Sequence, residues 1–76
     1  MRVFYKSKEA ALEAAKAYQE ENGGYIHEVI IPELADEDTG RIIGSCRMII
    51  VSDVPYADLL LNSTWEEGFY YDFEEL

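Results

Sequence analysis

The feature that most constrains the fold of this sequence is a well-delimited helical segment near its start. Ser7 is a residue type that favours the N-cap position, and residues 8–21 are mostly good helix formers. Ala11 and Ala15 recur at helical spacing and belong to one apolar stripe. Residues 22–24 (Asn-Gly-Gly) follow, and glycine readily takes the left-handed conformation that ends helices. The pattern predicts an α-helix over residues 8–21 with one face to bury.

Strand-like segments flank this helix on both sides. Residues 2–5 contain strong β formers, and residues 25–34 are rich in β-branched side chains. Pro32 cannot donate a hydrogen bond to a sheet ladder, so we expect residues 25–34 to lie at a sheet edge or near a strand end. The polar turn 36–40 ends in glycine, and residues 41–51 return as a further strand. The sequence therefore predicts a hairpin after the helix.

The returning strand has one face that is more uniformly apolar than the other. Its even positions include Ile42, Cys46, Met48 and Ile50, whereas its odd positions include Arg47. Because side chains alternate between the two faces of a strand, we expect the even face to point into the core. The odd face, which also carries isoleucine and valine, is expected to be partly covered.

The segment after this strand begins with a helix-start signal. Residues 52–55 combine capping side chains with a proline that is preset for the first turn. The pattern predicts a second helix over residues 54–67, stopped by Gly68. A break near Asn62 is the alternative, since Thr64-x-x-Glu67 would form a new capping box.

Residues 69–74 alternate in the manner of a last strand, whose inner face would carry Phe69, Tyr71 and Phe73. The order of elements is then β-α-β-β-α-β in one α+β domain spanning residues 1–76. Of the topologies with this order, a ferredoxin-like two-layer sandwich suits the length. The alternative is β-α-β-β-α with residues 69–76 as an extended acidic and aromatic C-terminal tail.

The composition favours a folded cytoplasmic protein. Of the 76 residues, 49% are hydrophobic, which is too many for a disordered acidic tail. Cys46 is the single cysteine, so no internal disulfide can form. No basic segment followed by an apolar stretch opens the chain, and no apolar run approaches the ~20 residues that span a bilayer. We expect a cytoplasmic location, or the host cytoplasm if the chain is encoded by a phage.

Negative charge is concentrated towards the C-terminus. The net charge is −10, and no Lys or Arg follows Arg47, whereas seven acidic residues do. Nucleic acids and anionic membranes attract proteins through positive charge. Direct binding to either is therefore disfavoured, and a partner protein with a basic surface is favoured.

Motifs for catalysis, cofactors and metals are weak. One cysteine and one histidine cannot build a structural zinc site, and the Asp36–Asp38 turn lacks the ligand order of a calcium loop. Cys46 and His27 are more simply read as structural residues than as a nucleophile and its base. No glycine-rich phosphate loop or nucleophile elbow is present. We expect no enzymatic activity, no cofactor and no metal.

Acidic and aromatic residues together suggest a protein-binding surface. Aromatic side chains anchor interfaces, and carboxylates steer a basic partner. Acids spaced along one side could also imitate a phosphate backbone, as in small acidic phage-encoded, anti-CRISPR-like inhibitors, which share only size and charge with this chain. A structural or self-associating domain is the alternative, for instance a homodimer formed through Ile43, Ile49 and Val51. The residues expected to bind a partner are Asp36, Glu37, Asp38, Asp58, Trp65, Glu66, Glu67, Tyr70, Asp72, Glu74 and Glu75.

Overall fold

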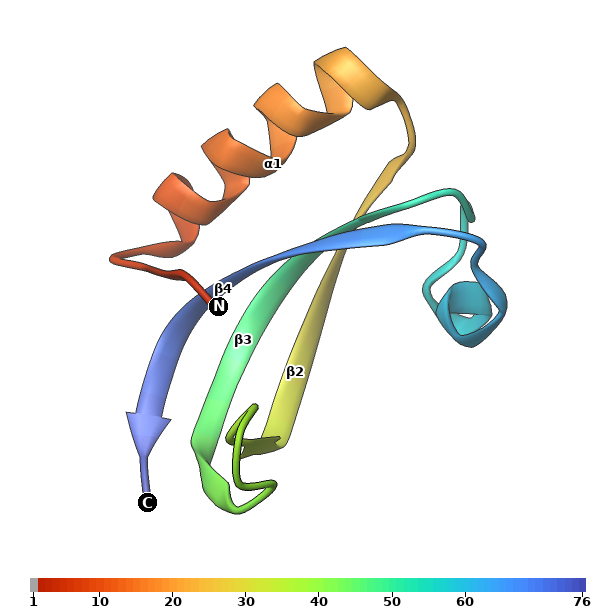
Figure 1. Cartoon of the computed structure of the whole chain (residues 1–76). Coiled ribbons are helices and arrows are strands. Elements are labelled where there is room, and N and C mark those ends of the chain that lie inside the picture. Colours follow the sequence, from red (N-terminus) through yellow and green to blue (C-terminus); the bar gives the residue numbers. More distant parts are fainter. Residues whose placement is uncertain (1) are drawn as a thin grey trace.

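One helix covers one face of a four-stranded mixed sheet in the computed structural model, which describes residues 2–76 (Figure 1). The strands lie side by side in the order β1-β4-β3-β2, with β1 parallel to β4 and the other pairs antiparallel. Within the described residues, no helix combines the length and apolar character needed to cross a membrane. In chain order the elements are β1 (Phe4–Tyr5), α1 (Lys8–Asn22), β2 (Tyr25–Ala35), β3 (Ile42–Ser52), the 3₁₀ helix η1 (Ala57–Asn62) and β4 (Glu66–Glu75).

Helix α1 begins and ends as its sequence predicts. The Ser7 hydroxyl accepts a hydrogen bond from the Ala10 backbone N–H at 3.2 Å. At the other end Gly23 has a φ of 76°, and its N–H donates to the Gln19 carbonyl at 2.7 Å. The N-cap and the glycine together satisfy backbone groups that a helix leaves unpaired at its ends.

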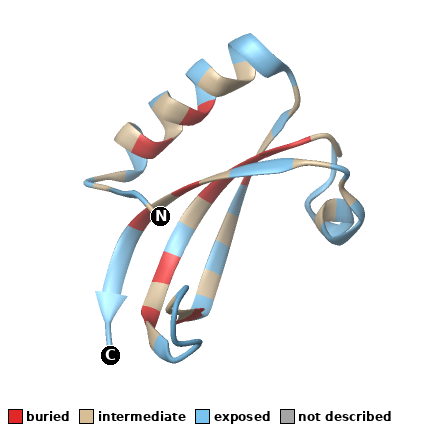
Figure 2. Cartoon of the chain, in the orientation of Figure 1, coloured by how far each residue is buried: buried red, intermediate tan, exposed pale blue. Residues whose placement is uncertain are grey.

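The main core lies between α1 and the sheet. Ala11 and Ala15 are fully buried, and their small side chains let the helix approach the strands closely. The sheet contributes four buried side chains to the same cluster: Ile49, Val51, Phe69 and Tyr71 (Figure 2).

The prediction that the even face of β3 forms this core is wrong, because the helix covers the odd face. Ile49 lies opposite Phe69 in the sheet, so the odd face of β3 continues the aromatic face of β4. The even face is nevertheless also protected from solvent, since Cys46 is 3% exposed and Ile50 is 7% exposed. Apolar alternation could not distinguish the two faces because β3 is buried on both.

Curling of the sheet protects the second face. β2 lies at one edge of the sheet, as Pro32 predicts, and β1 lies at the other. Even so, the guanidinium of Arg2, just before β1, donates to the carbonyl of Ala35 at the end of β2, with an N···O distance of 2.6 Å. The two edges therefore meet at this end of the molecule, where Leu34 is only 4% exposed. Irregular pairing near Leu34 and near Ser45 bends the strands, as β-bulges do.

A further irregularity in β4 changes the face of Phe73. The sequence predicts Phe69, Tyr71 and Phe73 on one face, and the first two do share the core. Asp72 has a φ of 56°, which breaks the alternation between Tyr71 and Phe73. The Phe73 ring consequently packs against Phe4, with centroids 5.0 Å apart, on the side of the sheet away from the helix.

The second α-helix predicted over residues 54–67 is absent, so the ferredoxin-like arrangement is not confirmed. The connection forms only the short η1, and Gly68 lies inside β4 rather than after a helix. Because β3 and β4 are antiparallel neighbours, they need no crossover helix between them. The alternative with residues 69–76 as a tail is also wrong, since β4 lies between β1 and β3.

Two glycines in the sheet should differ in how much their substitution by alanine destabilises the protein. A Cβ at Gly44 would collide with the backbone carbonyl of Glu74, whereas a Cβ at Gly68 would meet the mobile end of the Met48 side chain. We expect Gly44→Ala to lower the free energy of unfolding by about 1–3 kcal/mol, as overpacking does. Gly68→Ala should cost less because Met48 can change rotamer. Urea denaturation measures both, and equal losses would contradict the described β3–β4 contact.

Candidate functional site

The residues expected to bind a partner lie in three parts of the structure. They are the turn between β2 and β3, the connection between β3 and β4, and strand β4 itself. Several of them also have contacts within the chain.

The acids of the β2–β3 turn mainly build the turn. The Asp36 carboxylate accepts hydrogen bonds from the backbone N–H groups of Asp38 at 2.8 Å and Thr39 at 3.0 Å. These bonds, first the one from Thr39, hold the pKa of Asp36 below its ordinary value. Glu37 lies 3.6 Å from the Arg2 guanidinium in an ion pair. Asp38 is exposed.

The two aromatic residues of the predicted surface are packed against the fold. Trp65 is half-buried, and its ring centroid lies 6.3 Å from that of Tyr18 on α1. Tyr70 lies on the opposite side of the sheet, 5.7 Å from the Phe4 ring, with the Arg2 guanidinium 5.6 Å from its ring centroid. Both rings therefore contribute to internal contacts as well as to any surface they share.

The acids of β4 form two groups rather than one row. Glu66 and Glu67 pair with the end of β3, whereas Glu74 and Glu75 pair with its beginning. Eight positions separate Glu66 from Glu74, or about 26 Å at a strand rise of 3.3 Å per residue. The aromatic run between them carries no charge, and Asp72 lies 3.8 Å from Arg47 in an ion pair.

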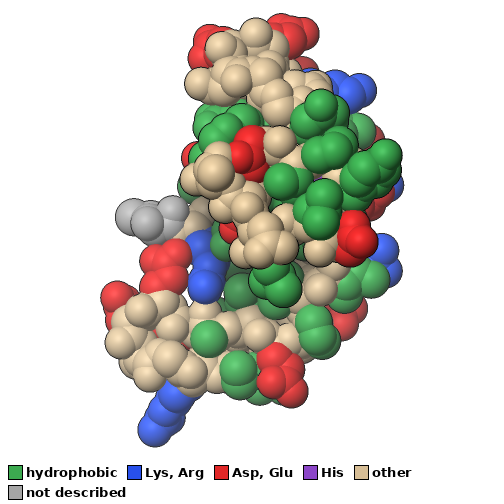
Figure 3. Space-filling model, turned by 90° about the vertical axis from the view of Figure 1, so that its right-hand side faces the viewer, with side chains coloured by type: hydrophobic (Ala, Val, Ile, Leu, Met, Phe, Trp, Pro, Cys, Tyr) green, Lys and Arg blue, Asp and Glu red, His purple; other side chains and the backbone are tan. Residues whose placement is uncertain are grey.

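The β3–β4 connection, which the sequence predicted to be helical, carries exposed apolar side chains. Tyr56 is 67% exposed and Leu61 is 97% exposed. Leu59 is also exposed, and none of the residues 57–62 is buried (Figure 2). Figure 3 shows hydrophobic side chains gathered on the face that carries this segment, with carboxylates among them. Asp58 belongs to the same segment.

The sequence contained a signal for this surface. Three consecutive leucines point in different directions around a helix, so one of them must leave any core stripe. The predicted helix over residues 54–67 would have put Leu59 and Leu60 on one face and Leu61 with Trp65 on another.

Polar contacts hold the connection at its base. The Asp53 carboxylate accepts hydrogen bonds from the backbone N–H of Thr64, at 2.9 and 3.1 Å, and from its hydroxyl. The buried His27 ring places Nε2 2.8 Å from the Val54 carbonyl oxygen. The exposed segment therefore leaves the sheet from a fixed position.

Cys46 and His27 do not form a catalytic pair. His27 lies opposite Ile50 and Cys46 lies opposite Ile31, so four ladder positions, or about 13 Å, separate them. Burial raises the pKa of the Cys46 thiol, which disfavours the nucleophilic thiolate. Among residues 2–76, no group of three or more His, Cys, Asp or Glu side chains is arranged to hold a metal ion.

A polar cluster beside α1 joins the helix to two strands. Glu28 Oε1 accepts hydrogen bonds from Lys8 Nζ at 2.9 Å and from the Tyr71 hydroxyl at 3.0 Å. The bond from Lys8 and then the bond from Tyr71 lower the pKa of Glu28. The bond to Glu28 raises the pKa of Lys8, and burial followed by that same carboxylate raises the pKa of Tyr71.

No protein-family model matches the chain, and no curated protein or solved structure is similar to it. The case for a function therefore comes from the geometry and charge of its own residues.

The Glu28 cluster predicts a pH-dependent stability. A carboxyl whose pKa is lowered on folding stabilises the protein above its unfolded pKa, and this contribution is lost as pH falls through the folded value. We expect Glu28→Gln to be destabilising at pH 7, and the difference from wild type to shrink below the ordinary glutamate pKa of 4.5. Urea denaturation from pH 7 to pH 3 measures this difference.

Glu13→Gln provides the control, because Glu13 is an exposed glutamate on α1 that is not part of the Glu28 cluster. A constant Glu28→Gln penalty over the whole pH range would argue against the ionised Glu28 contact.

Proposed function

We propose that this chain is a non-enzymatic protein-binding domain that recruits a partner with a basic surface. The observation that carries the proposal is the charge of its second half. No Lys or Arg follows Arg47, whereas the acids there are exposed or half-buried at the surface of the connection and β4. These acids are Asp53, Asp58, Glu66, Glu67, Asp72, Glu74 and Glu75.

Such a surface selects its partners by charge. Uncompensated carboxylates accelerate encounters with a positively charged protein and repel anionic ones. Nucleic acid and anionic membrane are therefore poor direct partners. The same reasoning disfavours a second copy of the chain, because each copy carries a net charge of −10.

Mimicry of a nucleic acid, as in phage-type inhibitors, is a narrower form of this proposal. A mimic would present carboxylates at intervals that follow a phosphate backbone, and B-DNA carries about one charge per 3.4 Å along each strand. Between Glu67 and Asp72, β4 has four uncharged residues, so these two carboxylates lie about 16 Å apart along the strand at a rise of 3.3 Å per residue. This spacing supports binding to a basic protein in general more strongly than imitation of a continuous backbone.

Self-association through Ile43, Ile49 and Val51 has less support. Ile49 is 1% exposed and Val51 is fully buried beneath α1, so neither is free to meet another chain.

Affinity capture with charge-neutral variants tests the proposal. The tagged protein is incubated with lysate of the cell that produces it, eluted with increasing salt, and the eluate is identified by mass spectrometry. We expect a protein with a basic surface that is released by moderate salt, since exposed charges are screened over about 10 Å at 0.1 M ionic strength. The variants Glu66→Gln/Glu67→Gln and Glu74→Gln/Glu75→Gln should slow its association several-fold.

Glu20→Gln/Glu21→Gln is the matched control, because it removes the same charge from the exposed end of α1. Recovery of the chain alone would contradict the proposal. A partner whose retention is indifferent to salt and to the β4 charges would contradict it as well.

A further inference from the structure

The connection between β3 and β4 exposes apolar side chains that the fold itself does not use. We define the anchor patch as Tyr25, Tyr56, Leu59 and Leu61, whose exposed fractions are 49%, 67%, 39% and 97%. None belongs to the buried core or to the partly buried side chains packed against it. Clustered apolar surface of this kind, ringed by polar residues, marks interaction sites in proteins.

We propose that the anchor patch is the apolar centre of the binding surface and docks into an apolar pocket rimmed by Lys and Arg on a partner protein. The inference rests on the proposed function and adds to it the residues that contribute most of the affinity. Aromatic and large apolar side chains at the centre of an interface commonly do so, whereas the surrounding charges set rate and register.

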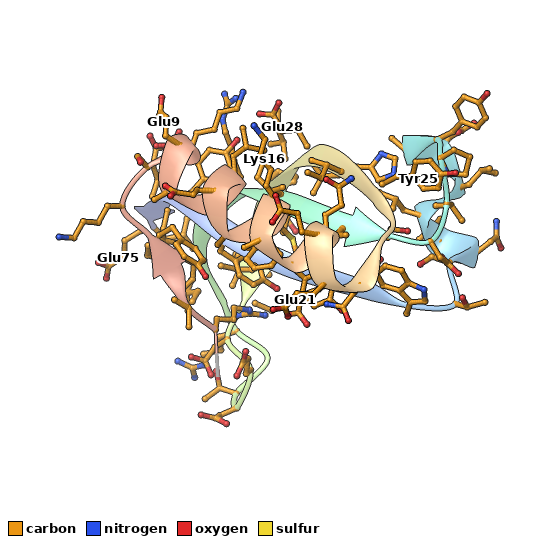
Figure 4. All side chains as sticks on the ribbon, turned by 90° about the horizontal axis from the view of Figure 1, so that it is seen from above. Glu9, Lys16, Glu21, Tyr25, Glu28 and Glu75 are labelled. Atoms are coloured by element: carbon orange, nitrogen blue, oxygen red, sulfur yellow. The ribbon has the colours of Figure 1, made fainter. Side chains whose placement is uncertain are left out.

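The geometry of η1 places Tyr56 and Leu59 on one side, and Leu61 lies in the same short helix, two positions after Leu59. In a 3₁₀ helix, residues three apart lie on the same side. Tyr56 and Leu59 are so spaced, and the Leu59 N–H donates to the Tyr56 carbonyl at 3.0 Å. Tyr25 begins β2 opposite Ser52, at the root of the connection. Figure 4 shows Tyr25 at the same end of the molecule as η1 and at the opposite end from Glu75.

The base of the patch is already ordered. The Asp53–Thr64 hydrogen bonds join the start of the connection to its end, and the contact between His27 and Val54 holds its first residues against β2. The Ser63 hydroxyl also donates to the Leu60 carbonyl at 2.9 Å. A segment held in place before binding loses less conformational freedom when its partner arrives.

Charge decides the kind of partner. Residues 53–67 include four acids, Asp53, Asp58, Glu66 and Glu67, and contain no Lys or Arg. A second copy would bring the same carboxylates to the contact and be repelled. A partner that offers Lys or Arg around an apolar pocket satisfies both the anchor patch and its rim.

Selection from a displayed peptide library tests this inference without knowledge of the natural partner. A random peptide library is panned against the wild-type protein, with removal of clones that bind the Tyr56→Ser/Leu61→Ser variant. We expect enriched peptides that combine apolar residues with Lys or Arg. Their binding shifts the fluorescence of Trp65, the single tryptophan, which lies next to the connection.

The controls separate binding from folding. Leu61 is almost fully exposed, so Leu61→Ser should leave the urea midpoint unchanged while weakening peptide binding by about tenfold or more. Leu76→Ser is the matched control, since Leu76 is 87% exposed but lies outside the patch, and it should bind as wild type does. The inference would be overturned if no peptides were enriched, if the enriched peptides lacked basic residues, or if they bound Leu61→Ser as tightly as wild type. A homodimer whose interface contains the anchor patch would overturn it as well.

The two proposals can fail separately. A natural partner captured from lysate that depends on the β4 charges but binds Tyr56→Ser/Leu61→Ser normally would retain the proposed function and refute the anchor patch. A captured partner that is indifferent to salt and to the β4 charges would refute the proposed function itself.

Discussion

The sheet has two apolar faces, but α1 can cover only one of them. The rest of the structure depends on how the other face is protected from solvent. Helix α1 covers one face, with Ala11 and Ala15 pressed against β3 and β4. Within residues 2–76 no helix covers the other face, and the sheet curls so that Arg2 bridges to Ala35 across its two edges. Arg2 also lies over the Tyr70 ring, where apolar residues of the second face meet. The curl takes the place of a second covering layer in a chain too short to supply one.

Apart from Trp65, which packs against the core, this arrangement leaves the β3–β4 connection outside the core. Antiparallel neighbours can be joined by a simple loop, so nothing requires residues 53–65 to form a helix on the sheet. Tyr56, Leu59 and Leu61 remain exposed although their burial would stabilise the fold, by about 1.5–3 kcal/mol for each large side chain. In a small domain with little stability to spare, an ordered but exposed apolar segment is most simply understood as a surface that a partner covers. We propose that the carboxylates of the same segment then favour a partner with a basic surface.

The sequence predicted those elements whose signals are local. Ser7 and Gly23 delimit α1, the 36–40 turn joins two strands, and Pro32 correctly indicates an edge strand. What depends on tertiary geometry was missed. The face of β3 could not be chosen because both faces are buried, and the position of Phe73 depends on one positive φ at Asp72. The capping signals at Ser52 and Asp53 were real, but their side chains bond to Val54 and Thr64 in a loop instead of starting a helix. The sequence showed which site residues are acidic. Their division into two groups depends on the strand register, which the sequence does not reveal.

Site-specific photo-cross-linking in the cell that makes the protein tests the central claim most directly. A photoreactive amino acid replaces Leu61 in one variant and Leu76 in another, and the cross-linked products are identified by mass spectrometry. Both positions are highly exposed, but only Leu61 belongs to the anchor patch. We expect position 61 to cross-link to one protein through a site flanked by Lys or Arg. Higher salt applied before irradiation should reduce the yield, and position 76 should give much less product. The proposed binding surface would be contradicted if position 61 cross-linked only to further copies of the chain. Equal, salt-independent yields at both positions would contradict it as well.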